Sequence, residues 1–450
     1  MKLTLAPALR VGSSPCVAFI GAGGKTTAMF QLARQLPSPV IVTGTSHLGL
    51  WQGKWADQHI ITETPARLEE LERGLKGVIL VTGETDGDRV KPINSELLIW
   101  LKEFCGDHSI PLLIEADGSR MKPLKAWAEH EPPIPSFVET VVQVVGLTGL
   151  GKTLSHENVH RPEIFAKLSG LHVGELITPD SLVRVLTHPE GGLKNIPTYA
   201  QRAILLNQAD TPELQSATLG LAKALLPTYP SVIVSSLEQK KIFAVHEPVA
   251  GIILAAGESR RFGQPKQLLD WKGQPFVRAV AKTALEAGLS PVIVVTGANA
   301  EQVELAVKDL DVTVIRNEEW KSGQASSIRA GVRALTPKPT PITGEGNAGA
   351  AIFLLADQPQ VNTSILRALV EKHAKGLYPI IAPMVMDRRA NPVLFDQVTF
   401  PDLLLLEGDV GGRAVFHRHR VEYLTWHDDR LLLDVDTPEM YQRLISDETL

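Results

Sequence analysis

Short apolar runs recur through both halves of the chain, and amphipathic stretches separate them. The clearest runs cover residues 17–24, 39–44, 77–83, 111–118, 249–257, 291–297 and 350–359. Continuous apolar runs of this length are typical of strands that are buried on both faces, and helical spacers between them favour parallel sheets. The pattern therefore predicts an α/β fold throughout.

Two of these runs end in glycine-rich turns that lead into predicted helices, at residues 21–27 and 255–266. One α/β domain normally carries one phosphate-binding turn after its first strand. Two such turns therefore predict two sequential domains, each with three layers and a mainly parallel sheet.

The charged segment 235–248 has weak patterning and precedes a new strand, so we place the domain boundary near residue 246. The predicted domains are then 1–246 and 247–450. The segment 336–350 is rich in proline and glycine, which predicts an exposed loop inside the second domain.

Composition excludes several classes of protein. Of the 450 residues, 44% are hydrophobic and 21% are charged, as in globular proteins with full cores. The net charge of −5 gives no general attraction to nucleic acid or anionic membranes. Two cysteines, Cys16 and Cys105, have no CxxC partner, which argues against a disulfide scaffold or a thiolate metal site. We expect a cytoplasmic protein with no nucleic-acid or membrane partner, which binds anions at local sites.

The turn LAAGESRRFGQPK at 254–266 has the chemistry of a triphosphate site. The small side chains of Ala255, Ala256 and Gly257 let backbone N–H groups approach phosphate oxygens closely, and Leu254, which precedes them, is assigned to the same site. Ser259 adds a hydroxyl donor, and Arg261 and Lys266 add two cations. The alternative is a glycine turn with surface cations.

A carboxylate follows the apolar run at 350–355. Asp357 should emerge at the carboxyl end of the sheet, where ligands of α/β domains collect. A hard oxygen ligand at that place suits Mg²⁺, and Asp436 is the candidate for a second carboxylate on the same ion. The alternatives are a strand-end cap for Asp357 and ordinary turn chemistry for Asp436.

The string 254–266 resembles the signature LAAGxSxRxGxxK of the MobA-like nucleotidyltransferases, and in particular molybdenum cofactor cytidylyltransferase. Further similar strings follow in family order at 317–320, 323–328, 355–359, 391–395, 408–413 and 434–438, so that the resemblance covers residues 249–450. It implies a Rossmann-like nucleotidyltransferase domain. It also implies that Gly323, Ser326 and Ser327 belong to the segment that closes over the base and ribose.

The resemblance implies a reaction in which the terminal phosphate of molybdopterin attacks the α-phosphorus of CTP and pyrophosphate leaves. Arg261, Lys266 and Asp357 are the expected catalytic residues, with Mg²⁺ as cofactor. Family members that use CTP tend to carry LAAG and those that use GTP tend to carry LAGG, so Ala256 favours CTP. The chain departs from the family at Phe262, where methionine is usual, and at Asn391, where histidine is usual.

The N-terminal string VAFIGAGGKTT at 17–27 has a P-loop arrangement of strand, glycine turn, lysine, threonine and helix. Gly21, Gly23 and Gly24 would form the turn, Lys25 would reach over the phosphates, and Thr26 would bind Mg²⁺. The full pattern requires glycine at position 19, where this chain has phenylalanine, so the loop is a shortened variant.

The run 111–118 ends in two carboxylates, Glu115 and Asp117, and we expect Asp117 to be the acid that completes the magnesium site. ATP is the expected nucleotide, with another NTP as the alternative. Asn207-Gln208-Ala209-Asp210 is similar to the guanine-reading NKxD turn, but Gln208 replaces the lysine.

Strings at 115–135, 146–152 and 158–163 resemble the YqeC-type accessory proteins, a family linked to selenium-dependent molybdenum hydroxylases. The resemblance covers roughly residues 10–245. Four residues in it could line an anion site or could simply be solvated or packing residues: Lys122, Lys125, His130 and His160.

Three hypotheses follow. The first is a molybdenum cofactor cytidylyltransferase fused to a nucleotide-binding accessory domain for molybdenum hydroxylase maturation. The second is another transferase, either a GTP-using guanylyltransferase or an enzyme that forms other NDP compounds. The third is a non-catalytic chaperone that binds the cofactor and docks onto a hydroxylase.

Overall fold

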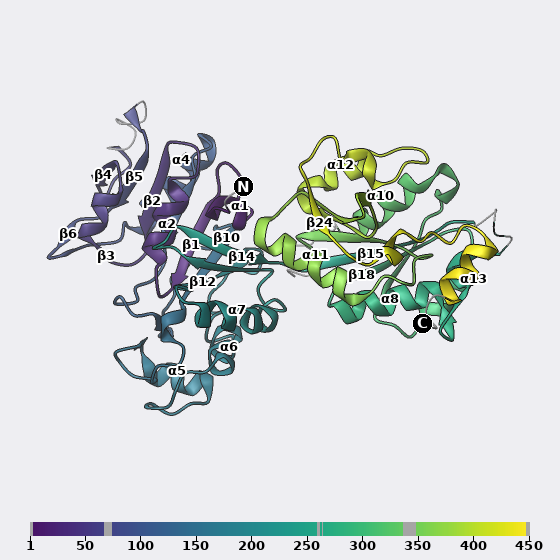
Figure 1. Ribbon diagram of the computed structural model, residues 1–450. Helices are drawn as coiled ribbons and strands as arrows, with labels where there is room; N and C mark the ends of the chain where they lie inside the picture. The colour runs from purple at the N-terminus through teal and green to yellow at the C-terminus, as the bar shows by residue number, and fades with distance from the viewer. Residues whose placement is uncertain (1–2, 67–73, 259–261, 263, 336–347, 447–450) are drawn as a thin grey trace. The chain divides into compact units, whose positions relative to one another are not determined.

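The computed structural model describes residues 3–66, 74–258, 262, 264–335 and 348–446. The chain divides into two compact units, one ending at His246 and the next beginning at Glu247. Both units are α/β, and the main sheet of each is mainly parallel, which confirms the predicted fold class (Figure 1). The expected loop at 336–350 falls largely outside the described residues.

The main sheet of the first unit has nine strands in the described part of the chain. In spatial order they are β14 (Lys241–His246), β13 (Ser231–Ser236), β12 (Gln201–Asn207), β10 (Thr140–Gly146), β1 (Cys16–Gly21), β8 (Leu112–Glu115), β2 (Val40–Gly44), β5 (Val78–Thr82) and β4 (Gln58–Ile61). Neighbouring strands are parallel except β13 and β14. The weakly patterned segment before residue 246 therefore includes an edge strand, whose half-exposed residues explain its weak apolar pattern.

Both faces of this sheet are buried, as the continuous apolar runs predicted. Ala18 and Ile20 lie in a core with residues of α4, while Val17 and Phe19 point the other way and are equally buried. The helices are α1 (Leu5–Ala8), α2 (Lys25–Ala33), α4 (Ser95–Asp107), α5 (Pro162–Ser169), α6 (Pro179–Thr187) and α7 (Pro212–Leu225). Shorter elements are β3 (Leu48–Gly49), η1 (Leu50–Trp55), β6 (Thr85–Asp86), β7 (Arg89–Val90), β9 (Leu124–Lys125), η3 (Leu147–Gly149) and β11 (Val159–His160).

The main sheet of the second unit has eight strands in the described residues. Their order is β19 (Thr313–Arg316), β18 (Val292–Thr296), β15 (Val249–Ala255), β20 (Ala350–Leu355), β23 (Val393–Asp396), β21 (Ile380–Val385) and β22 (Arg388–Arg389), and β24 (Val421–Thr425) also pairs with β21. The strands from β19 to β20 are parallel, whereas β23 is antiparallel to both of its neighbours.

Helices cover both faces of this second sheet, which makes three layers. Residues such as Ile253 and Ile352 face a core shared with α8 and α11, and Ile252 faces a core shared with α10. The helices are α8 (Phe276–Ala287), α9 (Ala300–Val307), α10 (Gln324–Leu335), α11 (Thr363–Gly376), α12 (Phe400–Leu404) and α13 (Pro438–Ser446). Shorter elements are η4 (Lys266–Leu268), β16 (Asp270–Trp271), β17 (Gln274–Pro275), η5 (Trp320–Ser322), η6 (Gln397–Thr399), η7 (Gly412–Val415) and η8 (Asp429–Leu432).

Strand register decides which turns meet at the carboxyl edge of each sheet. In the second unit Leu254 of β15 pairs with Leu355 of β20, so the glycine turn and the segment with Asp357 leave the sheet together. In the first unit Phe19 of β1 pairs with Glu115 of β8. In each unit a glycine turn therefore lies beside a carboxylate from a neighbouring parallel strand.

Candidate functional site

The second unit contains a cavity of about 680 Å³ at the carboxyl ends of β15 and β20. It is lined by residues 254–258, 266–267, 320–324, 327, 355–357 and 409. Most of the residues predicted for the C-terminal site line this cavity. Ser259 and Arg261 lie outside the described residues.

Backbone groups of the glycine turn form one wall of this cavity. Gln267 Nε2 donates to the carbonyl of Gly257 at 3.0 Å, which holds the turn from one side. A Cβ atom added at Gly257 would meet nothing within 4 Å, so the backbone there faces open space. Ala256, in contrast, packs closely: a Cβ at Gly297 would lie 2.8 Å from the Ala256 methyl group.

Lys266 and Asp357 of the cavity lining belong to a cluster of charged side chains. Lys266 Nζ lies 2.6 Å from Asp436 Oδ1 and 3.7 Å from Asp357 Oδ2. Burial raises the pKa of Asp357, the charge of Lys266 opposes this rise, and the carboxylates of Asp434 and Asp436 add to it. Gln358 Nε2 in turn donates to Asp434 Oδ1 at 2.9 Å. Asp357 and Asp436 can therefore share one cation.

The segment predicted to close over the base and ribose contains residues that line the cavity and a buried residue that supports them. Gly323 and Ser327 line the cavity. Ser326 is buried beneath it, where its hydroxyl donates to the Gly323 carbonyl and accepts from Asn317 Nδ2, both at 2.8 Å. Gly323 has φ of 110°, and a Cβ there would lie 2.4 Å from the Gly408 carbonyl oxygen, so only glycine fits this corner.

The glycine turn of the first unit connects β1 to α2 and is tightly enclosed. Gly21, Gly23 and Gly24 all have positive φ, at 95°, 81° and 127°. A Cβ at Gly23 would lie 2.4 Å from the Gly146 nitrogen, and one at Gly24 would lie 2.4 Å from Asn207 Nδ2. That amide donates to the Gly23 carbonyl at 2.7 Å, so Asn207 supports the loop.

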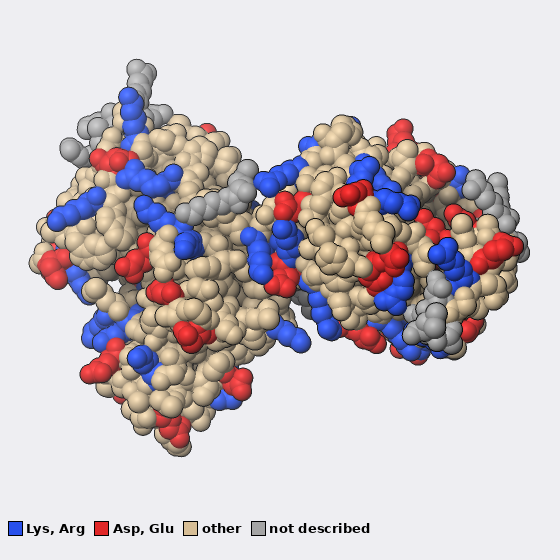
Figure 2. All heavy atoms as spheres, in the orientation of Figure 1, with Lys and Arg blue, Asp and Glu red and all other residues tan. Residues whose placement is uncertain are grey.

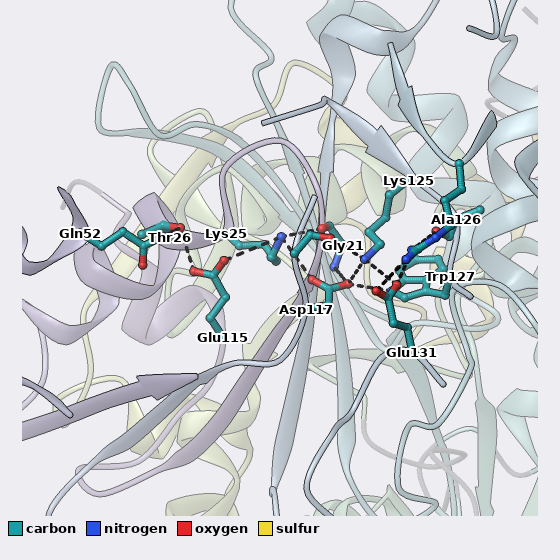
Figure 3. Close-up of polar contacts among 12 residues, drawn as sticks. Gly21, Lys25, Thr26, Gln52, Glu115, Asp117, Lys125, Ala126, Trp127 and Glu131 are labelled. Carbon is teal, nitrogen blue, oxygen red and sulfur yellow. Dashed lines mark hydrogen bonds and ion pairs between the residues drawn. The ribbon is translucent and has the colours of Figure 1, made fainter. Parts of the chain in front are cut away.

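Lys25 and Thr26 at the start of α2 contact two carboxylates (Figure 3). Lys25 Nζ donates to the Gly21 carbonyl at 2.7 Å and lies 3.2 Å from Asp117 Oδ1 and 4.0 Å from Glu115 Oε1. Thr26 Oγ1 donates to Glu115 Oε2 at 2.8 Å. Burial raises the pKa of Glu115, and the Lys25 charge and the Thr26 hydrogen bond oppose that rise.

Asp117 connects the loop to a buried chain of opposite charges, also drawn in Figure 3. Its Oδ2 accepts from Trp127 Nε1 at 2.7 Å and lies 3.0 Å from Lys125 Nζ. Lys125 Nζ also donates to Glu131 Oε2 at 3.2 Å, and Arg161 binds both oxygens of Glu131. Burial alone would raise the pKa of Glu131, but these cations outweigh it and lower that pKa to about 2.

A cavity of about 380 Å³ opens above this glycine turn. It is lined by residues 23–27, 47, 49, 51–52, 88–89, 115, 118–122 and 208. Arg89, Arg120 and Lys122 bring cationic side chains to it. Arg120 and Met121 both have left-handed backbone, with φ of 49° and 60°, a strained conformation that often marks functional loops.

On the face drawn in Figure 2, charged side chains of the described residues do not gather in one patch. On the face in Figure 2, cationic and anionic side chains are interspersed over both units. Within the described residues, no helix has the length and apolar character needed to cross a membrane. Nor do three or more histidine, cysteine or carboxylate side chains gather there as a ready metal site.

Each unit of the chain matches a protein family. Residues 17–163 match the YqeC protein family, and residues 251–423 match the MobA-like NTP transferase domain. The chain joins a YqeC domain to a MobA-like NTP transferase domain.

Each of three relatives matches less than half of this chain. Uncharacterized protein YqeC of Escherichia coli (strain K12) is 33% identical over 43% of this chain and 75% of its own length. The MobA-like domain is similar to nicotine blue oxidoreductase of Paenarthrobacter nicotinovorans, which is 31% identical over 44% of this chain and 96% of the relative. It is also similar to purine catabolism protein PucB of Bacillus subtilis (strain 168), 30% identical over 42% of this chain and 93% of the relative.

The YqeC domain differs most from the sequence-based assignment of site residues. Asp117, expected to bind metal, is 1% exposed and lies beneath the glycine turn, whereas Glu115 lines the cavity and contacts Thr26. Gln52 also contacts Thr26, and nothing in its local sequence marks it.

The four candidate anion-binding residues of the YqeC domain separate in the structure. Lys122 lines the cavity, but Lys125 is buried in ion pairs. Burial and the neighbouring charge of Arg161 lower the pKa of His160 to about 4, so its ring is neutral at pH 7. His130 is exposed and is not among the residues that line the cavity.

Proposed function

We propose that the MobA-like domain transfers CMP from CTP to the terminal phosphate of molybdopterin and releases pyrophosphate. The observation that supports this most is that the glycine turn, Lys266 and Asp357 line one cavity, and that Asp436 pairs with Lys266 beside it. A triphosphate needs both backbone donors and cations, and this cavity offers them together.

In the proposed mechanism the protein positions the two substrates and stabilises the charge that develops in the transition state. It forms no covalent bond with either substrate. The N–H groups of residues 255–257 hold the triphosphate, while Lys266 places its ammonium group beside the phosphates. Asp357 and Asp436 would hold Mg²⁺, since their oxygens already share one cation in Lys266. When bound, the ion would neutralise charge that develops on the phosphate oxygens. The acceptor phosphate attacks the α-phosphorus and the bond to pyrophosphate breaks.

The preference for CTP over GTP rests on Ala256. Ala256 lines the cavity and its methyl group lies against Gly297, and we propose that this methyl group takes up space that a larger purine would need. Glycine at 256 would leave this space open.

We also infer that the YqeC domain has a P-loop-like site for ATP or another NTP. It has the glycine turn, Lys25 at the start of α2, and the Thr26–Glu115 hydrogen bond beside the cavity. We propose that the two domains together serve the maturation of a molybdenum hydroxylase.

The decisive experiment incubates the full chain with molybdopterin, Mg²⁺ and each NTP in turn, and measures pyrophosphate and the labelled product. We expect CMP transfer with CTP. Lys266→Ala and Asp357→Asn should each lower kcat by about 10²–10³, the typical cost of removing one group that stabilises the transition state. Matched controls are Lys375→Ala and Asp309→Asn, which alter surface ion pairs and should have no effect.

Two outcomes would reject the proposal. GTP as the preferred donor, or transfer to another acceptor, would replace it with a different transferase. Molybdopterin binding without pyrophosphate release from any nucleotide would replace it with a non-catalytic chaperone.

A further inference from the structure

The segment from β3 through η1, residues 48–55, brings two side chains to the cavity of the YqeC domain. Trp51 and Gln52 both line it, opposite the start of α2. This segment follows β2, so it is distant in sequence from both the glycine turn and Glu115.

Gln52 has a buried amide whose orientation is fixed by its neighbour. The Thr26 hydroxyl has a single hydrogen and donates it to Glu115 at 2.8 Å, so toward Gln52 it can only accept. Gln52 Nε2 therefore faces Thr26, at 3.2 Å, and Oε1 points away. The side chain is 5% exposed, and Oε1 has no hydrogen-bond partner within the described residues.

A buried amide oxygen without a partner needs a donor or a cation. Gln52 meets the Thr26–Glu115 pair through its amide nitrogen, so three oxygen-bearing side chains are joined at the glycine-turn end of the cavity. Hard oxygen ligands suit Mg²⁺, which keeps several waters when it binds nucleotide phosphates. A water held by such an ion would supply the donor that the Gln52 oxygen lacks.

Trp51 offers a different contact. Its side chain is 48% exposed although it lines a polar cavity. Its ring packs edge-on against Trp55 with centroids 5.4 Å apart, and Trp55 packs in the same way on Phe30 of α2 at 5.5 Å. A Cβ at Gly49 would lie 2.3 Å from Trp51 Nε1, so glycine there makes room for the indole. An anchored, half-exposed indole is a platform for a flat ring.

We propose that residues 48–55 are the recognition element of the YqeC-domain site, which takes a nucleoside triphosphate with a divalent cation. Gln52 holds the hydration shell of the cation, and Trp51 stacks on the nucleobase. This inference rests on the proposed nucleotide site of the YqeC domain and adds the residues that select the two ends of its ligand.

The test measures binding to the full chain in a background with Asp357→Asn and Asp436→Asn, which removes the proposed cation ligands of the MobA-like domain. Bound Mn²⁺ is followed by electron paramagnetic resonance, and ligand affinity by calorimetry. The probes are ATP and inorganic triphosphate, each with Mn²⁺ and each with EDTA. Trp51→Ala and Gln52→Ala are compared with Leu50→Ala, an exposed neighbour that does not line the cavity.

The two variants should fail in different ways. Trp51→Ala should weaken the binding of ATP by about tenfold, within the range of base–aromatic stacking, and leave the affinity for inorganic triphosphate unchanged. In the presence of Mn²⁺, Gln52→Ala should weaken the binding of both probes by about 10- to 100-fold, as loss of an outer-shell partner of a metal does. With EDTA it should change the affinity for neither probe. Leu50→Ala should bind like the parent.

Failure of the inference and failure of the site give different results. If the parent binds ATP with Mn²⁺ but both variants bind equally well, the recognition element is refuted and the nucleotide site stands. If the parent binds neither probe, both are refuted. Gln52→Glu separates a lost cation contact from a folding defect. Its carboxylate should restore the Mn²⁺ binding that Gln52→Ala loses.

Discussion

Removal of the Asp117 carboxylate is expected to destabilise the YqeC domain by about 4 kcal/mol, the usual range for breaking a buried ion pair being about 3–5 kcal/mol. Asp117 is 1% exposed. Its carboxylate accepts from the N–H groups of Gly21 and Trp127 and lies 3.2 Å from Lys25 and 3.0 Å from Lys125. Asp117→Ala would therefore leave two ammonium groups and two N–H groups with fewer partners.

The magnitude follows from what each group retains. Lys25 keeps the Gly21 carbonyl at 2.7 Å, and Lys125 keeps Glu131 at 3.2 Å, so neither cation is left bare. The Trp127 indole N–H would lose its acceptor Asp117, and an unpaired buried donor costs about 1–3 kcal/mol by itself. For a domain of this size each kcal/mol lowers Tm by about 2–4 °C, so we expect a fall of about 8–16 °C.

The assay is urea and thermal unfolding of the full chain, in which the two domains should give separate transitions. Asp117→Asn is the matched variant: its amide oxygen can still accept from the two N–H groups, but the charge is lost and the NH₂ group replaces the oxygen that faces Lys25, so it should cost less than Asp117→Ala. Asp210→Ala changes an exposed carboxylate and is the control. The loss of a buried ion pair should lower the free energy of unfolding by several kcal/mol. A decrease below about 1 kcal/mol for Asp117→Ala would therefore refute the reasoning. So would an equal shift of both transitions.

Three further predictions concern single side chains. Ala256→Gly should move the ratio of kcat/KM for CTP and GTP toward GTP by about tenfold, since one methyl group in a binding pocket is worth 1–3 kcal/mol; an unchanged ratio would exclude Ala256 as the base selector. Because burial raises the pKa of Asp357, activity should fall on acidification through that raised pKa, as the carboxylate becomes protonated, and a pH–rate profile whose acidic limb lies in the ordinary Asp range would contradict this. Asn207→Ala removes the donor to the Gly23 carbonyl and the acceptor for the Leu237 N–H, so it should destabilise the YqeC domain by about 2 kcal/mol and weaken ATP binding in calorimetry. Unchanged ATP affinity would mean that the glycine turn keeps its shape without Asn207.

Local pattern was enough to predict the fold class and the two glycine turns. A strand buried on both faces must be apolar along its whole length, and a phosphate-binding turn needs small residues, so both leave a continuous signature. Each of the seven apolar runs contains a strand of a main sheet. The edge strand β14 was missed because an edge strand is half exposed and needs no such signature.

Only the tertiary structure decided which side chains meet. Glu115 and Asp117 are two residues apart, yet one reaches Thr26 and the other lies under the loop among buried cations. Gln52 reaches the same threonine from a segment 26 residues away, and its local sequence carries no trace of that contact. Periodicity records which face of an element is buried, whereas contacts between distant segments depend on strand register and on how the connecting chain is packed. That is why the sequence predicted a phosphate site and the fold alone determined its partners.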